Sequence, residues 1–484
     1  MRRSKIVLAA SAFVIAMALG QTTRAQLADR ETARTIAENW ITTVINYKGG
    51  WGGVPEAHVT NVAEFKRGDR VLGYFCEVEP SGHIIVSLIE GLAPIKGFSE
   101  TSTMDPLSDE GPADLFKLKM EQTLDFIEQR LGSTKSLTRA DLDRLPELDR
   151  RDTWAQLKAG PIPTNKRYDP DRSGGDYQES DELLTTHWHQ KYPYDLYCPA
   201  PPEGSSCTDP RCRVGCVATS GAMIARYWCW PLGRDWLNMP DAMNVNPTPA
   251  QIDAVAALNH DIGVAAGMNY CDEGCLSGVH VYEMEAVYEG MEYTACAGPW
   301  YRRDYSPTEW WDQIVSEISL NRPVHYHILK HSIVCDGYWQ LPDPMLHMNY
   351  GWSNDYTTWY VLDQLYQVDE EGSGYWEYFL DQIYPYSALG SAISGMWDYE
   401  PSWNPRFVDR DCTADSVDFM AGQDIHFHRQ KIMTCRSGWL NFYGQPGQNT
   451  RLFCGDVTRG VTINSGYILM YPGAQMKFAL SRPD

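Results

Sequence analysis

The sequence is short of basic residues: 41 Lys and Arg stand against 63 Asp and Glu, a net charge of −22 at pH 7. Nucleic acids and anionic membranes are bound through clustered cations, so this balance argues against either as the main partner. Charged residues make up only 21% and hydrophobic residues 43%, which argues against a mainly disordered chain. With 484 residues, the chain is too long for one ordinary core, and we expect about two to four domains.

Long hydrophobic runs are absent apart from Ile6–Leu19. This run is short for a membrane span, follows three basic residues, and precedes Ala25, which suits cleavage before Gln26. We therefore predict a signal peptide at residues 1–25, with export to the extracellular space or the periplasm and no membrane span after its removal. The alternative is an uncleaved anchor.

An exported chain can form disulfides. There are 13 cysteines, so at least one thiol is unpaired if every disulfide lies within the chain. The leftover thiol could be a nucleophile or an unreactive buried cysteine.

Residues 26–135 have the pattern of a small α+β unit. Helical spacing of apolar residues predicts helices at 29–47 and 112–131. Strand-like runs at 71–78 and 83–89 are separated by a Pro-Ser-Gly turn signal.

Residues 136–182 are polar and charge-rich and predict an acidic linker. Within it, Lys166–Glu182 is the best candidate for an activation cleavage. Asp169 and the residues after it resemble the start of a calcium loop, but Ser180 stands where the bidentate glutamate is required. We favour the linker over a calcium site, and predict no cofactor.

Residues 183–400 hold most of the tryptophan, tyrosine and cysteine, and residues 409–484 change to short alternating segments divided by turns. The latter pattern predicts a small all-β module. Four of its aromatic residues suggest a carbohydrate or protein ligand, and a purely stabilising appendage is the equal alternative: Trp439, Tyr443, Tyr467 and Tyr471.

The sharpest local signal is Cys216, which follows Gly215 and opens a run with helical spacing. A cysteine at a helix N-terminus favours the thiolate, because free N–H groups and the helix dipole stabilise negative charge. The thiolate is the nucleophile in covalent catalysis. A packed or disulfide-bonded cysteine is the alternative.

A thiolate needs a base, and His331 opens a strand-like segment that ends in Asp-Gly. His325 and His327 alternate on the preceding strand-like segment, a pattern that can ligate a metal, but no Cys or carboxylate pair completes the set. We expect these two histidines to be structural and predict no metal.

Further groups would complete an acyl-transfer site. Asn349 offers a side-chain carbonyl that can orient an imidazole, and Trp352 offers an indole that can shield it from water. Gln190 can supply an amide N–H beside the backbone N–H of Cys216 for an oxyanion. Alone, each of these would be a surface amide or a packed ring.

Four segments, in order, resemble the streptopain family of secreted cysteine peptidases, which is papain-like in fold. WHQKYPYDLYCP resembles its W-x-Q-x-x-P-Y-N-x-x-C-P segment, and RVGCVATSGAMIARYWCWP its V-G-C-V-A-T-A helix. HSIVCDGYW resembles its H-A-x-V-x-D-G-Y strand, and HMNYGWSNDYTTWYVLD its N-W-G-W turn. The resemblance covers about residues 183–385, and residues 28–105 more weakly resemble the family's inhibitory propeptide.

The resemblance implies an α+β fold, with a propeptide domain at 26–135, a two-lobed papain-like domain at 183–400 and the β module at 409–484. It implies a secreted precursor of a cysteine endopeptidase that acts on proteins or peptides and is inhibited by its own propeptide. The implied catalytic residues are Cys216 as nucleophile, His331 as general base and acid, Gln190 in the oxyanion hole, and Asn349 or Trp352 as orienting groups.

There are departures from the family pattern. Asp195 replaces the usual Asn, and Tyr350 replaces the first Trp of N-W-G-W, which puts the orienting group in doubt. They motivate a second hypothesis, an inactive binding or inhibitor protein on a peptidase scaffold. By analogy with papain, Cys212 and Cys229 are candidates for disulfides, whereas Cys76 and Cys335 are candidates for free thiols.

Overall fold

The computed structural model describes residues 27–385 with short gaps, and the strands that lie between residues 407 and 470. The gaps are 110, 165–166, 170–176, 229, 232–233, 244–245, 292, 329–330, 341, 353–356 and 362–376. The predicted signal peptide and the centre of the calcium-like loop lie outside the described residues. Within the described part, no helix combines the length and the apolar character that a membrane span requires.

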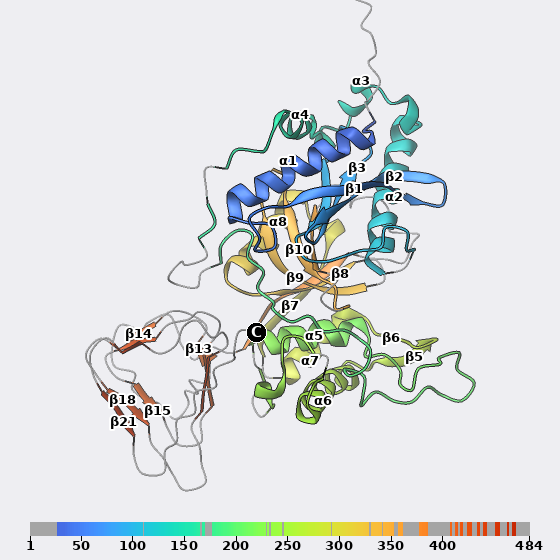
Figure 1. Cartoon of the computed structure of the whole chain (residues 1–484). Coiled ribbons are helices and arrows are strands. Elements are labelled where there is room, and N and C mark those ends of the chain that lie inside the picture. The colour runs from blue at the N-terminus through green and yellow to red at the C-terminus, as the bar shows by residue number, and fades with distance from the viewer. Residues whose placement is uncertain are drawn as a thin grey trace, which may run out of the picture.

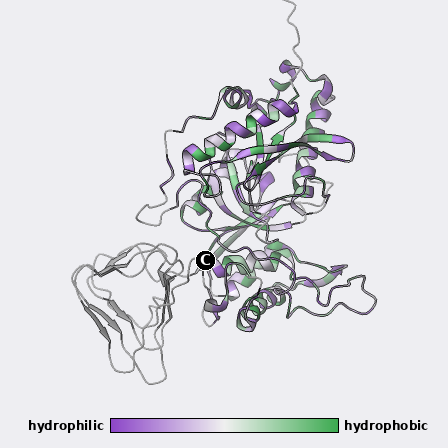
Figure 2. Ribbon diagram, in the orientation of Figure 1, coloured by the Kyte–Doolittle hydropathy of each residue, from purple (hydrophilic) through white to green (hydrophobic). Residues whose placement is uncertain are grey.

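The first described elements match the predicted α+β pattern. Helix α1 (Arg30–Lys48) begins where the Asp29 side chain accepts a hydrogen bond from the Thr32 N–H at 2.8 Å. It ends at Gly49, whose φ of 87° lies in the left-handed region that glycine adopts readily. Figure 2 shows hydrophobic and hydrophilic residues alternating around α1, as an amphipathic helix requires.

The predicted helix at 112–131 is α2 (Gly111–Leu131), and the two predicted strands are β2 (Arg70–Glu79) and β3 (His83–Ser87). Two strands that the sequence did not predict, β1 (His58–Arg67) and β4 (Ile95–Ser99), flank them. The predicted linker contains two further helices, α3 (Arg139–Leu142) and α4 (Arg151–Ala159).

The helix α4 has a physical reason to form within the polar segment. Trp154 and Leu157 are buried, and the indole N–H of Trp154 donates to the Leu92 carbonyl at 2.7 Å. Helix α4 also contacts α1, where the Asn39 side chain donates to the Leu157 carbonyl at 2.7 Å. The first half of the predicted linker therefore packs on the preceding unit, and we call residues 27–162 the N-terminal unit.

The remaining elements of the middle unit, residues 183–385, are as follows. The helices are α5 (Cys216–Trp228), α6 (Pro249–Ala265), α7 (Met284–Gly290) and α8 (Pro307–Ser319). The strands are β5 (Asn269–Glu273), β6 (Leu276–Gly278), β7 (Tyr293–Tyr301), β8 (Val324–Ile328), β9 (His331–Trp339), β10 (Met345–Asn349), β11 (Thr357–Val361) and β12 (Tyr378–Pro385).

One antiparallel sheet of ten strands runs through both units, in the order β1-β2-β3-β4-β11-β10-β9-β8-β12-β7. The two units meet at the pairing of β4 with β11, where Phe98 lies opposite Trp359 and Gly97 opposite Tyr360. Helices α1 and α2 lie on different sides of this sheet (Figure 1). The N-terminal unit is therefore a continuation of the sheet of the middle unit, not a separate body.

Helices α1 and α2 of the N-terminal unit pack on aromatic residues of the middle unit. On the α1 side, the rings of Trp40 and Tyr47 lie 5.4 Å and 5.1 Å from the ring of Trp339. On the α2 side, Phe116 makes an edge contact with Tyr360 at 5.6 Å. Burial of such large apolar surfaces is the main force that holds the units together.

The middle unit has the two lobes expected of a papain-like fold, and the predicted α+β class is confirmed. One lobe holds α5, α6, α7 and the β5–β6 hairpin, and the other holds the sheet (Figure 1). Helix α5 is almost completely buried: of its thirteen residues, all but Cys216 and Arg226 are buried.

The strands after residue 400 pair in parallel, in three sheets of three strands each. These strands are β13 (Phe407–Val408), β14 (Cys412–Ala414), β15 (Val417–Phe419), β16 (Asp424–Phe427), β17 (Met433–Cys435), β18 (Trp439–Phe442), β19 (Arg451–Cys454), β20 (Thr462–Ile463) and β21 (Tyr467–Met470). Each sheet takes every third strand, as in β13-β16-β19, so the chain winds through the three sheets in turn. The β-rich character of this region is as predicted.

Candidate active site

The candidate nucleophile stands at the first residue of a buried helix. Gly215, just before Cys216, has a φ of +89°, and a Cβ there would lie 2.7 Å from the Met268 sulfur and 3.0 Å from the Ser277 carbonyl oxygen. Only glycine suits this backbone and this space. The tight approach sets the direction in which the chain enters α5 and therefore the position of the Cys216 side chain.

The surroundings of Cys216 favour the neutral thiol over the thiolate. Burial raises the pKa of Cys216, against the effect of backbone N–H groups from Ser332, Val217 and Cys216 itself, which favour the thiolate. The contact with Ser332 places the sulfur beside the first residues of β9. The residue before Ser332 is His331, so the sequence-predicted nucleophile and base are brought together.

His331 is held in one tautomer by the backbone. Its Nε2 lies 2.8 Å from the carbonyl oxygen of Tyr350. A carbonyl can only accept, so Nε2 carries the proton and the neutral ring keeps its lone pair on Nδ1. A neutral imidazole in this tautomer can take a proton from a thiol.

The His331 ring is covered by an indole. The ring of Trp352 stacks on it with centroids 4.0 Å apart and an angle of 22° between the planes. Burial lowers the pKa of His331 to about 4, although the Tyr350 carbonyl opposes this shift and the neighbouring His327 adds to it. At neutral pH both members of the Cys216–His331 pair are therefore uncharged in this structure.

Asn349 does not contact His331 through its side chain, which corrects the role we expected for it. Its Nδ2 donates to the Thr186 carbonyl at 2.7 Å, and its Oδ1 accepts from the Gly351 N–H at 3.1 Å. The reason is that Asn349 ends β10 and its side chain closes the turn that follows. The carbonyl that orients His331 comes from the backbone of the next residue, Tyr350. This is the residue that replaces the first Trp of the family's N-W-G-W turn.

Gln190 is fixed to the extended segment that leads into the nucleophile. Its carbonyl accepts from the Val214 N–H at 3.0 Å, two residues before Cys216. Gln190, Cys216, His331 and Trp352 all line one cleft of about 1160 Å³. Four of the five sequence-predicted site residues thus share this cleft, and Asn349 supports the turn behind it.

Part of the cleft lining belongs to the N-terminal unit. Residues of the loop before α2, between Met104 and Asp109, and of the first turn of that helix, Gly111 to Leu115, line the same cleft as the candidate catalytic residues. Lys117 fastens this loop: its buried side chain donates to the Ser108 carbonyl at 2.7 Å and to the Asp109 carboxylate at 2.8 Å. No sequence motif marked Lys117, because its role depends on residues brought close by folding.

The alternating histidines of β8 have no metal-binding arrangement. Both nitrogens of His325 are engaged within the fold, Nδ1 with the Tyr288 hydroxyl at 2.9 Å and Nε2 with the Ser332 hydroxyl at 2.8 Å. In the part of the chain that the structure describes, one cluster has metal-ligand spacing: Cys207, Asp209 and Cys275. The two sulfurs of that cluster form a disulfide, so neither is a thiolate ligand.

Two disulfides connect the segment before Cys216 with the β5–β6 hairpin: Cys207–Cys275 and Cys212–Cys271. The expectation of a bonded Cys212 agrees with this pairing, and Cys229 lies outside the described residues. Among the described residues up to 385, the free cysteines are Cys76, Cys198, Cys216, Cys296 and Cys335. Burial raises the pKa of each of the other four free thiols, so the location of Cys216 in the cleft is what distinguishes it.

Substitutions at residues 350 and 352 test whether His331 depends on the backbone carbonyl of Tyr350 and on the side chain of Trp352. Tyr350→Phe should leave activity within about twofold, because His331 uses the Tyr350 carbonyl and not its hydroxyl. Trp352→Ala should lower kcat by about tenfold or more, because it uncovers the imidazole and its hydrogen bond to water. Steady-state kinetics of the two variants measures the difference, and equal losses would contradict it.

Comparison with known families agrees with this geometry. Residues 188–360 match the model of the Peptidase C10 family. The chain is 29% identical over 203 residues to the thiol protease/hemagglutinin PrtT of Porphyromonas gingivalis, over 36% of this chain and 22% of that protein. It is 26% identical over 217 residues to streptopain of Streptococcus pyogenes, over 37% of this chain and 54% of streptopain. The match therefore spans about half or less of these relatives.

Two solved structures are also similar. A fragment of Prevotella intermedia prointerpain A is 21% identical, with a TM-score of 0.47, and the match covers 67% of this chain and 99% of the fragment. Active interpain A of the same organism is 25% identical, with a TM-score of 0.35, over 42% of this chain and 94% of that one.

Proposed function

We propose that this chain, whose residues 188–360 form a streptopain-like cysteine peptidase domain of the Peptidase C10 family, is the latent precursor of an endopeptidase that hydrolyses proteins or peptides. The observation that carries the proposal is the placement of Cys216, His331 and Gln190 around one cleft, with His331 held in the tautomer that a base requires. The same arrangement disfavours the alternative of an inactive binding protein on this scaffold.

The chemistry follows from these positions. Nδ1 of His331 takes the thiol proton, and the Cys216 thiolate attacks the carbonyl carbon of the scissile bond. The backbone N–H of Cys216 and the Gln190 side chain donate to the oxyanion. The imidazolium then gives its proton to the leaving amine, and an acyl-enzyme remains. Water, deprotonated by His331, attacks the thioester and restores the thiol.

Latency has a structural basis in this proposal. The loop from Met104 to Leu115 occupies the side of the cleft where a substrate would enter, so the N-terminal unit acts as an inhibitory propeptide. The described part of the following segment passes from the N-terminal unit to the middle unit: the Tyr168 N–H donates to the Tyr47 carbonyl of α1, and the Leu183 N–H donates to the Asp336 carbonyl of β9. We propose that the activating cleavage lies in Lys166–Glu182, the stretch that the sequence suggested.

Removing the fastening of this loop should weaken latency. Lys117→Met keeps the length of the side chain in its buried site but removes both contacts to the loop, at Ser108 and Asp109. We expect the precursor to be activated several-fold faster than the wild type, because the loop loses both hydrogen bonds that hold it to α2. Lys135→Met, on the same unit and away from the cleft, is the control. Activation no faster than in the control would contradict the role of Lys117.

The proposal as a whole is tested by following the intact mass of the precursor, without its predicted signal, under mild reductant. We expect the chain to shorten by about 140–160 residues while peptidase activity against a fluorescent casein appears. A Cys216→Ala precursor should stay whole and inactive. If the wild type neither shortens nor gains activity, even after addition of an external protease, the proposed function is wrong.

Export through residues 1–25 belongs to the same proposal, since disulfides persist in an oxidising compartment. A carbohydrate or protein ligand for residues 409–484 remains a prediction. Deleting these residues and measuring binding to polysaccharides and to cell surfaces would test it, and unchanged binding would remove the recognition role.

A further inference from the structure

A two-stranded hairpin forms part of the cleft wall next to the nucleophile. Strands β5 and β6 make a sheet of their own, and Glu273, Cys275, Leu276 and Ser277 of this hairpin line the cleft. An isolated two-stranded hairpin is only marginally stable in water. Something besides its own pairing must therefore hold it in place.

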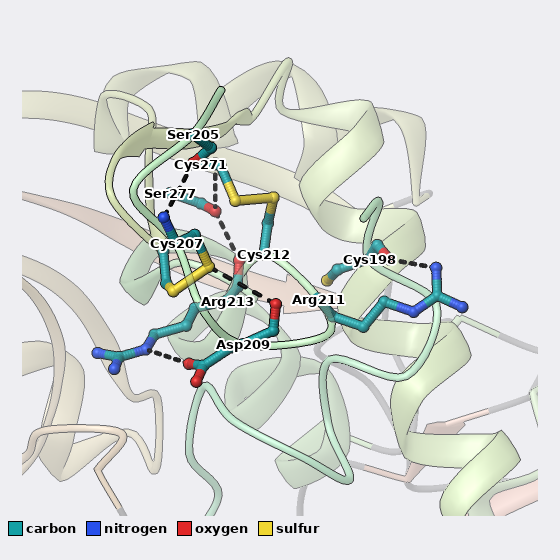
Figure 3. The surroundings of a disulfide bond; sticks show 10 residues. Cys198, Ser205, Cys207, Asp209, Arg211, Cys212, Arg213, Cys271 and Ser277 are labelled. Atoms are coloured by element: carbon teal, nitrogen blue, oxygen red, sulfur yellow. Dashed lines mark hydrogen bonds and ion pairs between the residues drawn. A yellow bond between two sulfur atoms is a disulfide. The ribbon is translucent and has the colours of Figure 1, made fainter. Parts of the chain in front are cut away.

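Two disulfides and two hydrogen bonds attach the hairpin to the segment before Cys216, and a third hydrogen bond lies within the hairpin (Figure 3). The Arg213 N–H donates to the Cys275 carbonyl at 2.9 Å, and the Ser277 hydroxyl donates to the Arg213 carbonyl at 2.6 Å. The same Ser277 hydroxyl accepts from the Cys271 N–H at 3.3 Å. Residues 207–213 and the hairpin thus form one cross-linked unit.

The two disulfides lie at different places in this unit. Cys207–Cys275 joins the turn end of the hairpin, both its residues are only half-buried, and Cys275 itself faces the cleft. Cys212–Cys271 joins the middle of β5, and its residues are buried. Cys271 also has a φ of 56°, a left-handed conformation that is uncommon for a residue with a Cβ and that persists where the surroundings impose it.

The buried disulfide is connected to the catalytic groups. Cys212 is four residues before Cys216, and between them Val214 holds the Gln190 carbonyl while Gly215 packs on the Ser277 carbonyl. A shift of residues 212–215 would therefore move the nucleophile and the oxyanion donor together. The half-buried disulfide reaches this segment through one backbone hydrogen bond, from the Arg213 N–H to the Cys275 carbonyl, and its two sulfurs hold the cleft-lining turn.

We propose that the two disulfides are positioning devices with separate effects on catalysis: Cys207–Cys275 holds the cleft wall and sets substrate affinity, and Cys212–Cys271 holds the nucleophile segment and sets the chemical rate. The inference rests on the proposed peptidase function. Its physical basis is preorganisation: a wall that is already ordered loses little freedom on binding, and a nucleophile that is displaced by about 1 Å can lose about 100-fold in rate.

The test compares the double variants Cys207→Ser/Cys275→Ser and Cys212→Ser/Cys271→Ser with the wild type, each activated from the full-length precursor. For the first, we expect KM to rise by about five- to tenfold with kcat within about twofold. For the second, we expect kcat to fall by about tenfold or more. Cys296→Ser, a half-buried free cysteine outside the cleft, is the control for the Cys→Ser change itself.

A second measurement covers the case in which a variant does not fold. The wild type is treated with increasing dithiothreitol, which gives two electrons and two protons to a disulfide and closes to its own cyclic disulfide. The half-buried Cys207–Cys275 bond should open first, and KM should rise before kcat falls. Alkylation and mass spectrometry identify which bond is open at each step.

The iodoacetamide reaction of Cys216 distinguishes failure of this inference from failure of the proposed function, because it requires no peptide hydrolysis. The Cys212→Ser/Cys271→Ser variant should change the alkylation rate of Cys216, and the other double variant should leave it within about twofold. If the wild type hydrolyses nothing but this difference holds, the function fails and the positioning role stands. Equal effects of both variants on kcat, KM and alkylation would overturn the inference.

Discussion

Replacing Cys216 with alanine should abolish peptide hydrolysis, with a fall in kcat of about 10⁴-fold or more. Cys216 is the free cysteine of the described chain that lines the cleft with His331 and Gln190. Without its sulfur no acyl-enzyme can form, and His331 has no thiol proton to take. The rate is measured on a fluorescent casein with enzyme activated by an external protease, so that a failure of self-processing does not confuse the result.

The matched control for this variant is Cys296→Ala, at another partly exposed free cysteine that does not line the cleft. It should keep activity within about threefold, because it changes packing and not the reacting groups. A Cys216→Ala enzyme that keeps more than about a hundredth of the wild-type rate would show that another group carries the reaction.

The second large effect concerns the reactivity of Cys216 before and after activation. In the precursor, burial raises the pKa of Cys216 and lowers that of His331 to about 4. At pH values above 4 and below the raised pKa of the thiol, the imidazole is neutral and the thiol is protonated. The thiolate is the reactive species. Alkylation of Cys216 in the precursor should therefore be slow at neutral pH and rise about tenfold per pH unit until the thiol ionises.

Activation should increase the reactivity of Cys216 at neutral pH. When the loop from Met104 to Leu115 leaves, the cleft opens to water and the burial that disfavours both charged forms is relieved. The thiolate–imidazolium pair becomes accessible, and we expect alkylation at pH 6–7 to be about 100-fold faster than in the precursor.

The comparison uses iodoacetamide, short reaction times and intact mass, so that only unprocessed precursor is counted. The His331→Ala precursor is the control, since its thiol has no imidazole to pair with. A precursor thiol that reacts at neutral pH as fast as the activated one would show that the N-terminal unit does not control the ionisation of Cys216.

Local patterns predicted the elements whose formation depends on neighbouring residues. Helical spacing predicted α1, and strand-like runs around a turn signal predicted β2 and β3. The two strands that flank β2 and β3 along the chain were not predicted. Strand β1 forms because it pairs with β2, and β4 forms because it pairs with β3 and β11. No local sequence pattern marks those partners. Likewise, α4 lies in a polar segment and forms where Trp154 finds a buried site.

The sequence by itself determined the α+β class and the chemical groups of the candidate site: the residue types at Cys216, His331 and Gln190 stand in motifs that span few residues. Only the tertiary structure decided how those groups are held. The carbonyl that orients His331 belongs to Tyr350, a residue that departs from the family pattern. The departure does not remove this contact, because any residue at that position supplies the same backbone oxygen. The partners of Cys212 and Lys117 depend on which segments fold together, and contacts between distant residues leave no trace in local spacing.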